Sequence, residues 1–213
     1  MDDIGTKILK FHAQLEGNGH HRYKSWEHCY TYFIKDKIDA DTACLQIAFY
    51  PASWGMYRDS SFLLWKDYLV HKDVVDHLLN NKHLQKLDFI DTTDEEIKEI
   101  FDLICWVKSW YRDKIDFVNG KRRKVNVTDT LATKILLGAL GCVPAYDRYF
   151  IGGIRSKGLS YSCLKPDNLS TVANFYKRNH SSFSCAKNEI WKLSGVSYPP
   201  MKLVDMYFWG IGY

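Results

Sequence analysis

The sequence has few of the features that mark a metal-rich or disulfide-rich protein. It contains 6 cysteines in 213 residues, and no two of them form the CxxC pair that is typical of zinc sites and redox motifs. We therefore expect no metal site and no cofactor, and we expect the cysteines to be reduced and buried. They are Cys29, Cys44, Cys105, Cys142, Cys163 and Cys185.

The sequence also lacks an apolar run long enough to span a membrane. The uncharged stretch from Ile135 to Tyr146 is too short to cross a bilayer, and it contains Pro144. The amino terminus begins with Asp2 and Asp3 and reaches lysines before any apolar run, which is the wrong order for a secretory signal. These features predict a soluble, cytoplasmic protein with no membrane partner.

Charge is unevenly distributed along the chain. The net charge is +4. Between Lys108 and Lys165, however, twelve basic residues minus four acidic ones give +8, which leaves −4 for the rest of the chain. This asymmetry favours an anionic partner such as nucleic acid.

Strand patterns are scarce, and helical periodicity dominates. In residues 92–114, apolar residues recur every three or four positions, and either Thr92 with Glu95 or Thr93 with Glu96 fits a capping box at the start. Amphipathic helices are also expected at 22–36 and 60–84. We predict an all-α, bundle-like fold of about eight to ten helices, each with uncertain boundaries.

The second half of the chain contains the turn signals. Asn119-Gly120 predicts a short hairpin or an exposed basic loop within 117–127, followed by a helix that begins at Thr128 or Asp129. Residues 199–212 predict a terminal helix that docks through one apolar face, with Lys202 and Asp205 on another side. Two organisations fit these patterns: a helical bundle at 1–116 with a basic helical unit at 117–213, or a single domain.

An apolar segment at 132–150 breaks at Gly141 and resumes at Pro144, with Asp147 just beyond. A structural interpretation suffices for this order, because glycine ends helices, proline begins them, and an acid near a helix start interacts favourably with the helix dipole. On this interpretation Asp147 is a helix-start residue and has no catalytic role.

The same order, with Arg148 after the aspartate, resembles the helix-hairpin-helix DNA glycosylases over residues 128–150. The resemblance implies that the protein binds nucleic acid, DNA rather than RNA. It also implies that Asp147 supports base release by stabilising positive charge on the sugar, with Lys134 as an amine nucleophile. Residues expected to contact phosphate groups are Lys121, Arg122, Arg123, Lys124, Arg148 and Arg155.

Two alternatives stay open. Arg22 and His28 resemble the closely spaced Arg and His of HEPN-type ribonucleases, and this resemblance implies RNA cleavage by a homodimer. A third possibility is a non-enzymatic helical module that binds another protein, in which the aromatic residues, 15% of the chain, form the core. The chain as a whole is similar to uncharacterised bacterial helical proteins, and that similarity implies no activity.

Overall fold

Helices make up nearly all of the regular structure, which confirms the all-α prediction. The computed structural model describes residues 3–58 and 60–213, and within them it contains ten α-helices, three 3-10 helices and one two-stranded hairpin. The α-helices are α1 (Asp3–Glu16), α2 (Lys24–Phe33), α3 (Ala40–Ser53), α4 (Lys72–Asn80), α5 (Asp94–Lys114), α6 (Asp129–Ala139), α7 (Arg148–Ser156), α8 (Pro166–Arg178), α9 (His180–Ser194) and α10 (Pro200–Gly212).

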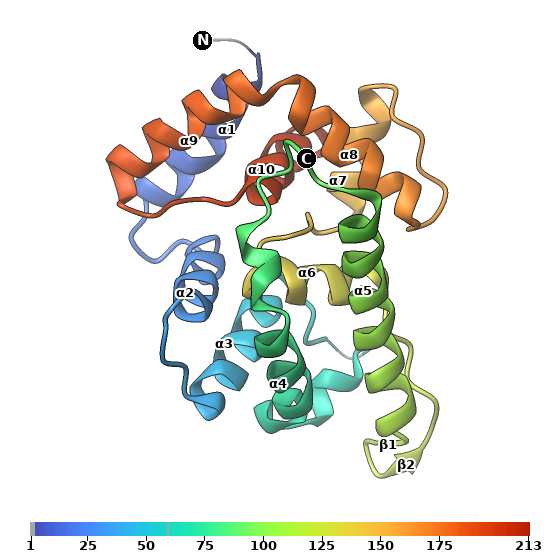
Figure 1. The fold of residues 1–213 in the computed structure, drawn as a ribbon. Coiled ribbons are helices and arrows are strands. Elements are labelled where there is room, and N and C mark those ends of the chain that lie inside the picture. The colour runs from blue at the N-terminus through green and yellow to red at the C-terminus, as the bar shows by residue number, and fades with distance from the viewer. Residues whose placement is uncertain (1–2, 59) are drawn as a thin grey trace.

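The helices form two tiers (Figure 1). The upper tier consists of α1 and α7 to α10, and the lower tier consists of α2 to α5 with the hairpin. Helix α6 lies between the tiers and packs against α2, α3 and α5. Buried apolar residues from both tiers belong to one continuous core.

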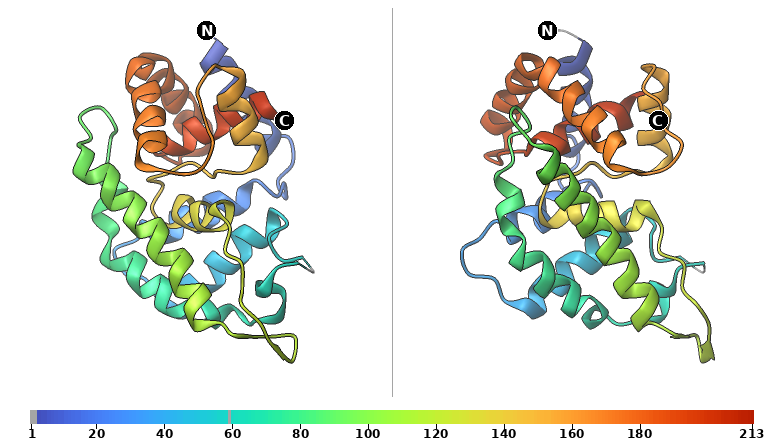
Figure 2. Two further views of the ribbon diagram at one scale, coloured as in Figure 1. Left: turned by 90° about the vertical axis from the view of Figure 1, so that its right-hand side faces the viewer. Right: turned by 45° about the vertical axis from the view of Figure 1, so that its right-hand side comes forward.

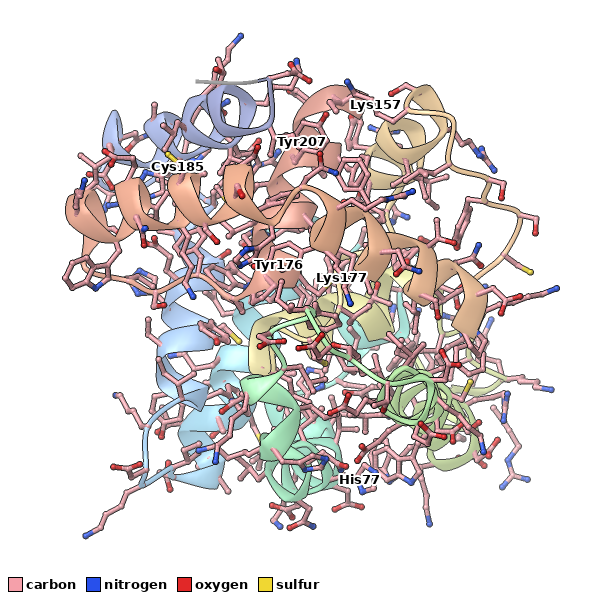
Figure 3. The ribbon with its side chains drawn as sticks, turned by 45° about the horizontal axis from the view of Figure 1, so that its top comes forward. His77, Lys157, Tyr176, Lys177, Cys185 and Tyr207 are labelled. Atoms are coloured by element: carbon pink, nitrogen blue, oxygen red, sulfur yellow. The ribbon has the colours of Figure 1, made fainter. Side chains whose placement is uncertain are left out.

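The tiers do not follow the predicted division between residues 116 and 117. Helix α1, from the start of the chain, packs against α9 and α10. Its Asp3 carboxylate accepts a hydrogen bond from Tyr207 at 3.1 Å and pairs with Lys157 at 3.2 Å. Figure 3 shows Tyr207 and Lys157 side by side at this end of the molecule. The choice between one domain and two stays a prediction.

Side-chain caps explain where several helices begin. Thr93 and Glu96 form the complete capping box at the start of α5, which selects one of the two predicted pairs. The Thr128 hydroxyl accepts a hydrogen bond from the Leu131 amide and thereby caps α6. Each cap satisfies an amide that has no partner within its own helix.

The helix expected at 60–84 is wrong in extent. The segment contains the 3-10 helices η1 (Phe62–Trp65) and η2 (Tyr68–His71), then α4, and η3 (Lys82–Lys86) follows. Asp67 explains the interruption, because its carboxylate accepts a hydrogen bond from the Leu69 amide and starts a new turn. Such local side-chain bonds compete with helix continuation.

The Asn119-Gly120 turn forms as predicted, in a hairpin shorter than 117–127. Strands β1 (Phe117–Val118) and β2 (Lys121–Arg122) pair antiparallel, with Val118 opposite Lys121. Asn119 and Gly120 both have positive φ, 52° and 71°, as a type I′ turn requires. The hairpin therefore carries the first basic residues of the Lys121–Lys124 cluster at an exposed tip.

Helix α10 is buried on all sides, which corrects the expectation of a single apolar face. Every residue from Pro200 to Trp209 is buried. Gly153 of α7 permits the close crossing of α7 and α10, because a Cβ atom at this position would lie 1.9 Å from the Phe208 carbonyl oxygen. Lys202 and Asp205 are buried together as an ion pair.

The cysteines are all free, but they are not all buried. All six cysteines are free thiols, but only Cys29, Cys44 and Cys142 are buried, so the expectation of burial is wrong for the other three.

None of the helices in the described part of the chain combines the length and apolar composition needed to cross a lipid bilayer.

Candidate functional site

A cavity of about 640 Å³ opens where the two tiers meet. Its walls come from Arg22 in the loop before α2, the loop after α3, the segment that enters α6, the first half of α6, the first turn of α7 and the end of α10. Figure 2 shows that the loop after α3 and the start of α7 lie on the same side of the molecule, with α6 between them. The volume falls within the range of small-molecule and cofactor sites.

Asp147 lies in the cavity wall and also caps α7. Its Oδ1 atom accepts hydrogen bonds from the amides of Tyr149 and Phe150, both at 3.0 Å. Its Oδ2 atom faces Lys134 Nζ at 3.2 Å. Asp147 therefore caps α7 through Oδ1, and its Oδ2 atom pairs with Lys134 in the cavity wall.

The backbone on the amino-terminal side of Asp147 is fixed by α6 and α10. The Tyr146 amide donates to Thr133 Oγ1 at 2.9 Å, and the Tyr146 carbonyl accepts from Thr130 Oγ1 at 2.8 Å. The Ala145 amide donates to Asp205 Oδ1 at 3.0 Å. These three bonds hold the Asp147 carboxylate in one place, as a preorganised charged group requires.

Lys134 is nearly enclosed. Its side chain is 5% exposed and that of Asp147 is 13% exposed. The Lys134 Nζ atom also lies 4.4 Å from the centre of the Trp54 ring, within range of a cation–π interaction. The Lys134 Nζ atom thus lies between a carboxylate and an aromatic face.

A second lysine lies behind the cavity wall. Lys202 Nζ pairs with Asp205 Oδ2 at 3.1 Å, and neither side chain lines the cavity. Burial lowers the pKa of Lys202, while Asp205 opposes the shift and Lys134 adds to it through charge repulsion. The two lysines therefore influence each other electrostatically.

Aromatic rings form much of one wall. Trp54 and Tyr149 each meet Trp209 edge to face, with ring centres 5.7 Å and 5.3 Å apart. Two guanidinium groups lie over these rings: Arg22 is 5.3 Å from the centre of Trp54, and Arg148 is 4.5 Å from the centre of Tyr149. The wall therefore combines flat apolar surface with positive charge.

The cavity is strongly positive. Among the described residues that line it, Arg22, Arg58, Lys134 and Arg148 are basic and Asp147 is acidic. Within this described lining, four positive charges minus one negative charge give +3. Such a site attracts an anion, and its aromatic faces suit a planar ring.

The structure brings some of the predicted residues together and leaves others apart. Lys134, Asp147 and Arg148 meet in the cavity, and Arg22 joins them from the alternative pair. His28 is exposed on α2 and lies outside the cavity lining. The remaining predicted phosphate contacts, all outside this cavity, are Lys121, Arg122, Arg123, Lys124 and Arg155.

Those remaining basic residues occupy three places. Arg122 is on the hairpin, where it pairs with Asp116 at 3.1 Å, and Lys121 and Arg123 flank it and are exposed. Arg155 donates a hydrogen bond to the Tyr161 carbonyl at 2.9 Å. Lys124 lines a second hollow next to the cavity. The predicted basic cluster is thus divided between the hairpin and that hollow.

Sequence reasoning missed Trp54, Arg58 and Trp209 as cavity residues. Trp54 and Arg58 lie in the loop that follows α3, where no periodic pattern assigns a direction to a side chain. A signal did exist for Lys202 and Asp205. Two opposite charges three residues apart in an otherwise apolar terminal helix indicate a pair that is buried with the helix.

Neither metal-binding clusters among the described residues nor similar proteins indicate a function for this chain. Within residues 3–58 and 60–213, no three His, Cys, Asp or Glu side chains are grouped to hold a metal ion. Comparison of the chain with models of protein families, with curated proteins and with solved structures finds no match in any of the three. The function must therefore be argued from the site itself.

Proposed function

We propose that this protein binds nucleic acid and releases a base from DNA, in the manner of a DNA glycosylase. One observation carries the proposal: a fixed carboxylate, Asp147, lies in the wall of a positive, aromatic cavity of about 640 Å³. A base can be cleaved from DNA only after it leaves the helical stack and enters a pocket with stacking surfaces. The ring of Tyr149 is a candidate stacking surface, and Arg22, Arg58 and Arg148 are candidate phosphate contacts.

The proposed reaction breaks the bond between the sugar C1′ atom and the base nitrogen. The bonding electrons leave with the base, which takes up a proton, while the sugar develops positive charge. Asp147 stabilises that charge electrostatically. Water then adds its oxygen to C1′ and loses a proton to solvent, so the products are a free base and an intact strand with an abasic site.

The surroundings of Lys134 favour base release without strand cleavage. A nucleophilic lysine needs a free amine. Lys134 instead pairs with Asp147 and lies over the Trp54 ring. We assign it the role of orienting Asp147 and donating a hydrogen bond in the cavity, in place of the nucleophilic role that the family resemblance implies.

The test is base release from duplex and single-stranded oligonucleotides that carry modified bases, detected as free base by mass spectrometry. The informative variant is Asp147→Asn. Asparagine also accepts hydrogen bonds from helix-start amides, so α7 keeps its cap while the negative charge is lost. We expect base release to fall by about 100-fold or more, the usual effect of removing one electrostatic contact to a transition state.

The matched control is Asp94→Asn, which removes an exposed carboxylate from the first turn of α5 outside the cavity lining. It should retain base release. Equal activity of Asp147→Asn and the unmodified protein would refute the catalytic role, and absence of base release from every substrate would refute the glycosylase proposal. The ribonuclease and protein-interaction hypotheses stay predictions.

A further inference from the structure

A second hollow lies beside the cavity and is also basic. It has a volume of about 420 Å³ and is lined by Lys108 and Arg112 of α5 and by the consecutive residues 124–127. Among the described residues that line it, three of six are cations and none is acidic. Asn126 lines both hollows, which makes them neighbours.

The segment between the hairpin and α6 connects the two hollows. It is extended, and its side chains alternate: Val125 and Val127 are buried, whereas Lys124, Asn126 and Thr128 are exposed. Alternation is expected for an extended chain, in which successive side chains point to opposite sides. Lys124 lines the second hollow, Asn126 lines both, and Thr128 lines the cavity, so one exposed row leads from one hollow to the other. Figure 2 shows this stretch rising from the hairpin to α6.

The backbone of this row and the side chain of Lys124 are available to a ligand. Within the described part of the chain, the backbone groups of residues 124–127 form no hydrogen bonds with other backbone groups. Lys124 also has no ion-pair partner there, whereas Lys108 pairs with Asp129 and Arg112 pairs with Asp113. Backbone groups without a protein partner must bond to water or to a ligand.

We propose that the row from Lys124 to Thr128 is the track of a nucleic-acid strand. One nucleotide occupies the cavity, and the phosphates of its neighbours lie in the second hollow against Lys108, Arg112 and Lys124. The inference rests on the proposed function and deepens it, because it makes the ligand a strand that extends past Asn126. It also moves the main phosphate contacts from the hairpin tip to α5 and the extended segment.

The test is equilibrium binding of labelled oligonucleotides of increasing length, and of a nucleoside monophosphate, across a salt series. The variant is Arg112→Gln/Lys124→Gln, which removes two exposed charges from the second hollow and none from the cavity. Each phosphate contact with a single strand contributes about 0.7 to the dependence of log affinity on log salt. We therefore expect this slope to fall by about 1.4 for long oligonucleotides, and we expect binding of the monophosphate to stay unchanged.

The matched control is Lys86→Gln/Lys98→Gln, which removes two exposed charges from outside both hollows. It should leave both slope and affinity unchanged. If long oligonucleotides bind the Arg112→Gln/Lys124→Gln variant with the same salt dependence of affinity as the unmodified protein, the proposed strand track is overturned. That result would leave the cavity proposal intact. Absence of any nucleic-acid binding would overturn both. Polyglutamate, added as a competitor, tests whether negative charge alone is enough for binding. If polyglutamate displaces the labelled oligonucleotide as effectively as an unlabelled oligonucleotide of equal charge does, the assignment to nucleic acid is overturned.

Discussion

Two lysine–aspartate pairs lie close together in this molecule, and they differ in what surrounds them. Lys134 with Asp147 and Lys202 with Asp205 have nearly the same separation, 3.2 Å and 3.1 Å. The first pair forms part of a cavity wall, and the second is sealed behind it. Asp147 keeps 13% of its side chain exposed, whereas Asp205 keeps 7%.

This difference separates a structural pair from one that is available to a ligand. The sealed pair is outside the cavity lining, and Asp205 uses its other oxygen to accept a hydrogen bond from the Ala145 amide. The cavity pair faces space that a ligand can enter, so an incoming anion can interact with Lys134 and an incoming cation with Asp147. Similar lysine–aspartate distances therefore occur in two pairs with different roles.

Breaking the sealed pair should have the largest effect on stability. Lys202→Met leaves the Asp205 carboxylate buried without its charge partner. Removing one member of a buried pair costs about 3–5 kcal/mol of unfolding free energy, because the remaining charge is uncompensated. Urea unfolding followed by circular dichroism measures the loss.

The control for this prediction restores neutrality. Lys202→Met/Asp205→Asn removes both charges and keeps an oxygen for the Ala145 amide, so it should recover much of the lost free energy. Lys72→Gln, which breaks the exposed Lys72–Asp76 pair, should cost less than about 1 kcal/mol. A loss for Lys202→Met no larger than that for Lys72→Gln would contradict the description of a sealed pair.

Breaking the cavity pair should cost less. In Lys134→Met the Asp147 carboxylate loses its charge partner but keeps both amide hydrogen bonds and its contact with the cavity. We expect a loss of about 1.5–3 kcal/mol, the range for a hydrogen bond to a charged group. The same unfolding assay measures it, and a loss equal to that of Lys202→Met would remove the distinction between the two pairs.

The fold could be predicted from the sequence where a pattern is local. The capping box at Thr93, the Asn119-Gly120 turn and the start of α6 at Thr128 each depend on residues within a few positions of one another. The continuous helix at 60–84 was wrong because apolar spacing alone does not register a cap such as Asp67, which diverts the chain into short turns.

The site was predictable only in part, for a related reason. Lys134, Asp147 and Arg148 lie within one stretch of sequence, so a local motif could name them. Trp54, Arg58 and Trp209 reach the same cavity from distant parts of the chain. Their meeting depends on how α3, α6, α7 and α10 pack, which no spacing rule encodes. Lys202 and Asp205 were assigned to the wrong surroundings because α10 was treated as half-exposed.

A buried histidine outside both pairs makes the stability of the protein depend on pH. His71 is fully buried, with Nε2 2.9 Å from the Tyr57 hydroxyl and Nδ1 2.5 Å from that of Tyr111. Burial lowers the pKa of His71 from 6.5 to about 3. Between these two values the unfolded chain binds a proton that the folded chain does not, so folded-state stability is complete above 6.5 and falls as pH decreases.

The predicted loss is small but specific to one residue. A single group of this kind changes the unfolding free energy by at most about 1.4 kcal/mol per pH unit. Between about pH 7 and about pH 5.5, the unmodified protein should therefore lose about 1 kcal/mol more than His71→Gln. Burial also lowers the pKa of His12, and its contribution cancels because both proteins contain it. Parallel curves for the two proteins would contradict the lowered pKa of His71, whereas a steeper fall for the unmodified protein would agree with it.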